Sequence, residues 1–72
     1  MKTLDLHNVR HKDVVRKVED FLAWEDLPAK IITGNSERMR ELVISVIKRC
    51  NLFCHYENLT NSGCLVVTRK DL

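Results

Sequence analysis

The chain has 72 residues and a formal net charge of +2, and 44% of its residues are hydrophobic while 31% are charged. This length and composition predict one folded domain over residues 1–72, without a linker, and exclude a disordered chain. The apolar stretches are too short to span a bilayer, and the amino terminus lacks the apolar core of a signal peptide. We therefore expect a cytoplasmic protein with no membrane partner. The small net charge does not by itself indicate a nucleic-acid-binding protein.

The first half of the chain predicts a strand, a helix and a second strand. Residues 3–7 alternate between apolar and polar side chains, which is typical of a strand buried on one face. Residues 11–24 carry apolar side chains three and four positions apart, which predicts a helix, and Pro28 prevents its continuation. The β-branched run at 29–33 predicts another strand that ends at Gly34.

The second half predicts a helix followed by two strands. Asn35 or Ser36 can cap the helix, and its three-four apolar spacing runs through Cys50. Three segments follow: an extended edge at 53–57, a turn at 58–63 and an apolar, more central strand at 65–68.

The order β-α-β-α-β-β predicts an α/β fold, a two-layer sandwich with a four-stranded mixed sheet. Two helices cannot cover both faces of such a sheet, so we expect them on one face, with the other partly exposed to solvent. Right-handed crossovers make the first two strands parallel if they are neighbours. The segments DLHN at 5–8 and TGNS at 33–36 would then meet at one edge, where open α/β sheets bind ligands.

Asp5 and His7 are the candidate catalytic residues. Two positions apart on a strand, they would project to the same side and reach one substrate. An imidazole can take or give a proton, and a carboxylate can orient it, bind a cation or position water. The alternative is that both belong to the polar outer face of the sheet.

The segment from Gly34 to Arg38 is a candidate anion site. A glycine after a strand, followed by Asn35, Ser36 and a helix, exposes backbone amides that favour a phosphate together with the helix dipole. Arg38, one turn into the helix, could add a direct contact. The alternative is an ordinary helix cap without a ligand.

Basic side chains near the predicted ligand edge are further candidate contacts to nucleic acid, and two aromatic side chains are not. Arg10, His11 and Lys12 begin the first helix, where cations oppose the helix dipole, and a locally unfavourable cluster beside the ligand edge indicates a functional site. The alternative is an ordinary solvated charge cluster. Trp24 and Tyr56 are expected to pack against the protein rather than to stack on bases.

The cysteines do not predict a metal site. Structural zinc sites usually take paired ligands such as C-x-x-C, and Cys50, Cys54, His55 and Cys64 lack that spacing. We expect free thiols that pack as small hydrophobic groups.

Three blocks of the sequence resemble the small MutS-related (Smr) domain over residues 4–70. LDLHNVRHKDVVRKVEDFL resembles the L-D-x-H block of the family and the helix after it. KIITGNSERMRELVISVIKRC resembles its [HT]-G-x-G loop and second helix, and SGCLVVTRK its glycine-containing turn and last strand. The resemblance implies a fold like that of the carboxyl-terminal domain of a bacterial translation initiation factor, and nicking of DNA or endonucleolytic cleavage of RNA.

The resemblance also assigns residues to the family's motifs. Asp5 and His7 match the acid and the histidine of the first block, Thr33 and Gly34 match the start of the loop, and Gly63 matches the final turn.

The sequence departs from the family's pattern at three places. Ser36 stands where the second loop glycine belongs, Asn8 replaces a frequent glycine after the histidine, and residues 60–62 lack the usual glycine pair. A serine can still cap the helix, but its β-carbon limits how closely a phosphate approaches the backbone.

The sequence thus predicts an Smr-like domain that binds DNA or RNA, and it leaves endonuclease activity open. His7 would act as general acid or base, and Asp5 would orient it or hold a divalent metal such as Mg²⁺; no cofactor is certain. The expected contacts to phosphate or nucleic acid are Arg10, His11, Lys12, Thr33, Gly34, Asn35, Ser36, Arg38 and Gly63. The alternatives are a non-catalytic nucleic-acid-binding module, or a small protein-interaction or inhibitor domain that uses the open sheet face. A monomer is expected.

Overall fold

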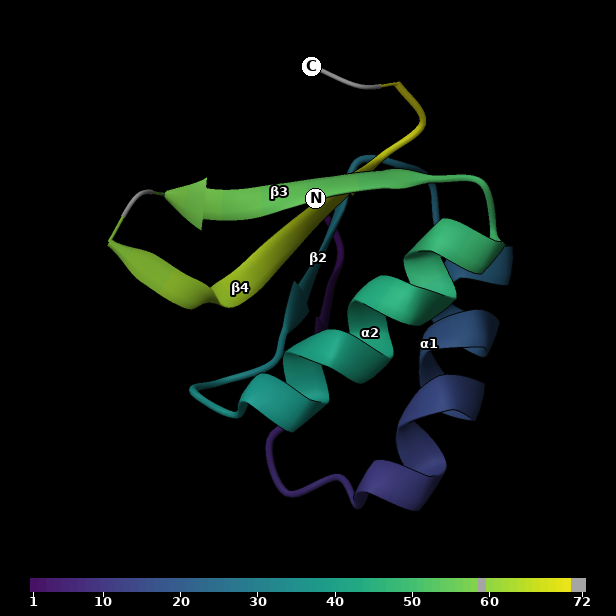
Figure 1. The fold of residues 1–72 in the computed structure, drawn as a ribbon. Helices are drawn as coiled ribbons and strands as arrows, with labels where there is room; N and C mark the ends of the chain where they lie inside the picture. Colours follow the sequence, from purple (N-terminus) through teal and green to yellow (C-terminus); the bar gives the residue numbers. More distant parts are fainter. Residues whose placement is uncertain (59, 71–72) are drawn as a thin grey trace.

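The chain forms a two-layer α/β sandwich in a computed structural model that describes residues 1–58 and 60–70 (Figure 1). Its elements are β1 (Thr3–Asp5), α1 (His11–Trp24), β2 (Ala29–Ile32), α2 (Glu37–Arg49), β3 (Phe53–Asn58) and β4 (Asn61–Thr68). The strands form one sheet in the order β1-β2-β4-β3, in which β1 and β2 are parallel and the other neighbours are antiparallel. The predicted fold class, the parallel first pair and the central position of the last strand are confirmed.

Both helices pack on the same face of the sheet, and the core lies between the two layers (Figure 1). Burial of apolar side chains stabilises this arrangement by about 25 cal/mol per Å². The core consists of Leu6, Val14, Val18, Ile31, Met39, Val43, Val46, Ile47, Leu65 and Val67. An exposed ion pair between Arg49 and Glu19, 4.0 Å apart, joins the helices at the surface and adds little to that energy.

The first strand is shorter than predicted, because β1 ends at Asp5 and not at residue 7. The amide of Leu6 still donates to the carbonyl of Ile32 (3.0 Å), but the chain then turns at His7 and Asn8. Asn8 has a φ of 64°, a left-handed conformation that asparagine tolerates better than most residues. This conformation explains how asparagine can take the place of the glycine that the resemblance suggests at this position.

The predicted turn at 58–63 is also shorter than expected. β3 continues to Asn58 and β4 already begins at Asn61, while residue 59 lies outside the described residues. Asn61 and Ser62 are exposed and polar, so they lack the apolar pattern that marks a strand in the sequence.

Three side chains expected to pack are largely exposed. Trp24 is 87% exposed at the last residue of α1, and Tyr56 is 46% exposed on the edge strand β3. Cys50 is exposed at the end of α2, whereas Cys64 is buried. The apolar spacing identified the helices correctly, but it did not predict that Trp24 and Cys50, at the carboxyl ends of the two helices, are exposed.

The loop between β2 and α2 is held against the start of β4. The amides of Thr33 and Gly34 both donate to the carbonyl of Gly63, at 2.8 and 3.1 Å. Arg40 adds a hydrogen bond from its guanidinium to the Gly34 carbonyl (3.3 Å). A β-carbon at Gly63 would lie 3.2 Å from the Gly34 carbonyl oxygen and 3.1 Å from Oδ1 of Asn61. A larger residue there forces the loop or the strand to move.

We expect Gly63→Ala to lower the free energy of unfolding by about 1–3 kcal/mol, because the added methyl group overpacks this contact. Urea denaturation followed by circular dichroism measures the change. Ser62→Ala, at the exposed neighbouring position, is the matched control and should stay within about 0.5 kcal/mol of wild type. Equal stability of the two variants would contradict the tight contact.

Candidate functional site

One hollow, with a volume of about 400 Å³, lies at the carboxyl ends of β1 and β2, and we call it the rim hollow. Its polar lining comes from both loops that the sequence places at this edge, namely Asp5, His7, Asn8, Thr33, Gly34 and Ser36. Leu6, Val9, Ile32 and Met39 contribute apolar surface. His7 and Gly34, which are far apart in the sequence, therefore line the same hollow.

The carboxylate of Asp5 holds the backbone of His7 and not its imidazole. Oδ1 of Asp5 accepts a hydrogen bond from the His7 amide at 2.9 Å, which closes a local turn. Both side chains are exposed, so a ligand in the hollow can reach the imidazole. The expected contact between the carboxylate and the imidazole is not formed here, and the role that the geometry supports for Asp5 is to position the His7 backbone.

The start of α2 offers backbone donors beside the rim hollow. The Gly34 amide is not among them, because Gly63 accepts it, and the Met39 amide donates to Oγ of Ser36 at 3.1 Å. Within residues 1–58 and 60–70, the amides of residues 35–38 have no protein acceptor, as is usual before and in the first turn of a helix. These amides and the positive end of the helix dipole favour an anion.

The charges near the rim hollow partly oppose one another. Arg38 is exposed, and its guanidinium lies 3.9 Å from the carboxylate of Glu41 in a surface pair that a phosphate can compete with. Asp5 lines the hollow and Glu37 is the first residue of α2, so both carboxylates weaken the attraction for an anion. An anion at this hollow would therefore depend on neutral amides as much as on cations.

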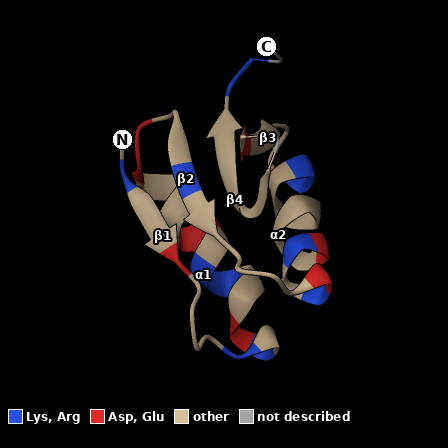
Figure 2. Ribbon diagram, turned by 90° about the vertical axis from the view of Figure 1, so that its left-hand side faces the viewer, with Lys and Arg blue, Asp and Glu red and all other residues tan. Residues whose placement is uncertain are grey.

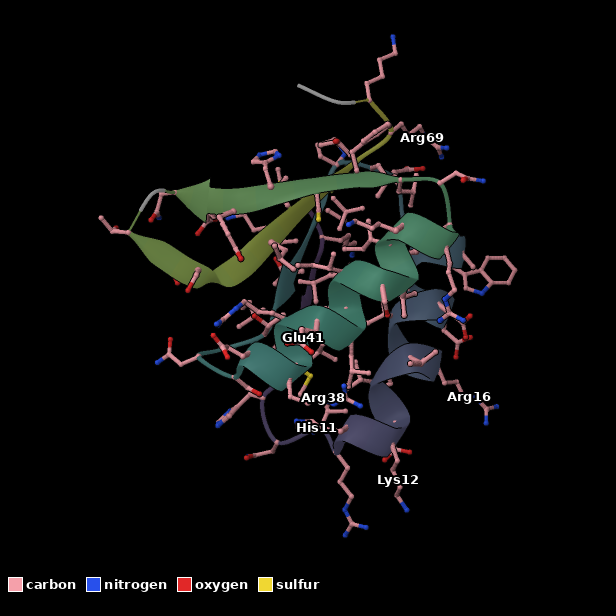
Figure 3. The ribbon with its side chains drawn as sticks, in the orientation of Figure 1. His11, Lys12, Arg16, Arg38, Glu41 and Arg69 are labelled. Carbon is pink, nitrogen blue, oxygen red and sulfur yellow. The ribbon has the colours of Figure 1, made fainter. Side chains whose placement is uncertain are left out.

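The basic cluster at the start of α1 lies outside the lining of the rim hollow. Arg10 occupies the N-cap position without a side-chain hydrogen bond, and α1 begins at His11. Figure 3 places His11 and Lys12 at the same end of the molecule as Arg38, whereas Arg69 lies at the opposite end. These exposed cations are available to a ligand that extends beyond the hollow.

Thr33 and Gly63, which the Smr resemblance assigns, hold the loop between β2 and α2 in place through hydrogen bonds. The Thr33 side chain is buried, and its hydroxyl lies 3.2 and 3.3 Å from the carbonyl oxygens of Gly34 and Gly63. Gly63 and Asn35 line a neighbouring hollow on the sheet. Arg40 donates a hydrogen bond to the Gly34 carbonyl and was not predicted from the sequence. Nothing in the sequence distinguishes it from other arginines on helices.

The donor atoms present do not form a metal site by themselves. Among the described residues, no group of three or more His, Cys, Asp or Glu side chains is placed to hold a metal ion. Burial raises the pKa of the Cys54 and Cys64 thiols, which favours their protonated, weakly nucleophilic form.

No protein-family model matches the chain, no curated protein matches its sequence, and no solved structure matches its fold. Within the described part of the chain, no helix has both the length and the apolar character needed to cross a bilayer. The likeness to Smr domains rests on the three sequence blocks.

Substitution of Ser36 tests whether its hydroxyl caps α2. Ser36→Ala removes the acceptor of the Met39 amide and should cost about 1 kcal/mol in the free energy of unfolding, whereas Ser36→Gly should cost only a few tenths. Chemical denaturation of both variants measures this. Wild-type stability of Ser36→Ala would show that the hydroxyl does not act as the cap.

Proposed function

We propose that this chain is an Smr-like domain that binds nucleic acid by holding a backbone phosphate in the rim hollow. The observation that carries the proposal is the shared lining: the turn with His7 and the loop with Gly34 and Ser36 border one hollow. A phosphodiester bound at the start of α2 would therefore lie beside an exposed imidazole.

The hydrogen-bonding groups at the hollow suit a phosphodiester. The amides of residues 35–38 can donate to its oxygens, and the partly exposed apolar surface from Val9 and Ile32 can contact a sugar. Arg10, Lys12 and Arg38 can follow neighbouring phosphates outside the hollow. Because Asp5 and Glu37 oppose the anion, we expect modest affinity that falls steeply as salt rises.

His7 gives the same site a means of cleaving the bound strand. Its imidazole can take a proton from the attacking hydroxyl or water, or give one to the oxygen that leaves phosphorus. Asp5 would support this step by fixing the backbone of His7 through the 2.9 Å hydrogen bond. This chemistry applies to RNA cleavage and to DNA nicking alike.

A binding module without cleavage is the second candidate. It is favoured because Asp5 bonds to the backbone amide of His7, and within residues 1–58 and 60–70 no carboxylate is hydrogen-bonded to the His7 imidazole. A catalytic histidine is commonly oriented by such a partner. The two candidates share the site and differ in the reaction.

His7→Ala distinguishes the two candidates. If His7 moves the proton, the variant should cleave structured RNA or nick supercoiled plasmid about 10²-fold or more slowly than wild type. Its affinity for a labelled oligonucleotide should change less than threefold, because the amides of residues 35–38 remain in place.

Gel-based cleavage assays and fluorescence anisotropy provide the two measurements, and Arg16→Ala is the matched control. Arg16 is exposed and points outward from α1, away from the sheet (Figure 3). Binding without cleavage by the wild-type protein would leave the binding module as the function, whereas wild-type cleavage rates in His7→Ala would contradict the role given to His7. Loss of binding alone, with normal cleavage at saturation, would contradict the role given to His7.

A further inference from the structure

The uncovered face of the sheet carries two more hollows that continue from the rim hollow. The first, which we call the middle hollow, has a volume of about 330 Å³ and is bordered by Gly34, Asn35, Lys30 and Glu57. The second, the far hollow, has a volume of about 590 Å³ and reaches Arg69 and Lys70. Gly34 borders both the rim and the middle hollow, and the Lys30–Glu57 pair borders both the middle and the far hollow. Together they form a continuous path across the sheet.

The positive charge of this path is concentrated at the far hollow. Figure 2 shows β1, β2 and β4 in front of α1, with basic positions on β2 and beyond the end of β4. Glu57, the acid that borders the far hollow, is paired with Lys30. Arg69 and Lys70 are exposed, and the Thr68 hydroxyl donates to the Lys70 carbonyl at 2.7 Å, which holds this segment next to the strand end. Among the described residues that border the far hollow, basic side chains therefore outnumber acidic ones.

The surface between these cations is suited to bases as well as to phosphates. Leu27, Pro28 and Val66 give the far hollow an apolar lining, and the exposed imidazole of His55 stands beside Val66 across the β3–β4 pair. Lys30 keeps its charge to alkaline pH, because its hydrogen bond to Glu57 and the charge of that carboxylate raise its pKa. A planar base can stack on an imidazole while the strand's phosphates meet the cations.

We propose that the open sheet face binds the continuation of a single-stranded nucleic acid whose phosphate is held in the rim hollow; this inference rests on the function proposed above. A single strand can bend from the rim onto the sheet. A duplex would have to bend sharply to follow this path within a domain about 28 Å across, and its persistence length of about 50 nm makes such a bend costly. An acidic peptide would satisfy the cations but leave His55 without a stacking partner. The path should accept about four nucleotides or more.

Oligonucleotide length is the variable that tests the inference. Fluorescein-labelled thymidylates of about 3 and about 12 nucleotides, together with a duplex of the longer one, are titrated by anisotropy at several salt concentrations. We expect the long strand to bind at least about tenfold more tightly than the short strand or the duplex. In Arg69→Ala/Lys70→Ala, the long strand should bind about five- to tenfold more weakly and its salt slope should fall by about 1.4, while short-strand binding is unchanged.

Two further variants separate stacking from charge. His55→Ala should weaken the long strand about fivefold or more, and His55→Phe should restore it, since phenylalanine stacks but carries no charge. Arg16→Ala, away from the sheet, should change neither strand. Circular dichroism verifies that each variant is folded.

The possible failures are distinguishable. Binding of the short strand that Arg10→Ala/Lys12→Ala weakens would support the rim site. If the long strand then binds no more tightly, or if Arg69→Ala/Lys70→Ala and His55→Ala have no effect, binding along the open sheet face is wrong and the rim site stands. Equal binding of the duplex, or equally effective competition by a polyglutamate peptide, overturns the single-strand assignment. If neither strand binds, the proposed function fails and this inference fails with it.

Discussion

Backbone hydrogen bonds on the two sides of the end of β2 determine where the candidate site forms. On one side, the Leu6 amide donates to the Ile32 carbonyl at 3.0 Å; on the other, the amides of Thr33 and Gly34 donate to the Gly63 carbonyl at 2.8 and 3.1 Å. These contacts satisfy polar groups that burial would otherwise penalise. They also bring two loops from distant parts of the chain to one edge, so the rim hollow is a consequence of sheet pairing.

The same hydrogen bonds limit which groups can hold a ligand. Because Gly63 accepts the Gly34 amide, an anion must use the amides that follow, at residues 35–38. Asp5 and Glu37 lie close by, so the site lacks the strong positive field of a dedicated phosphate pocket. We therefore propose that affinity increases with the length of the bound strand, through one phosphate at the rim hollow and further contacts along the open sheet face.

The sequence predicted those features that depend on periodicity and chain topology. The bounds of α1 follow from its apolar spacing, and the parallel pairing of β1 with β2 follows from the handedness of crossovers. Prediction from the sequence failed where a hydrogen bond, local or between distant residues, overrides the pattern of apolar and polar residues. Alternation extended the first strand to His7, but the Asp5 carboxylate turns the chain there. No local signal reveals that Gly34 donates to Gly63, because that contact depends on the folded sheet.

Amide chemical-shift mapping by ¹H–¹⁵N NMR during titration with a single-stranded oligonucleotide tests the central claim most directly. We expect the amides of His7, Asn8 and residues 35–38 to shift together at the lowest ligand concentrations, and these shifts to shrink as salt is raised. Shifts confined to the outer surface of α1, or shifts in one of the two loops without the other, would show that the loops do not share a phosphate.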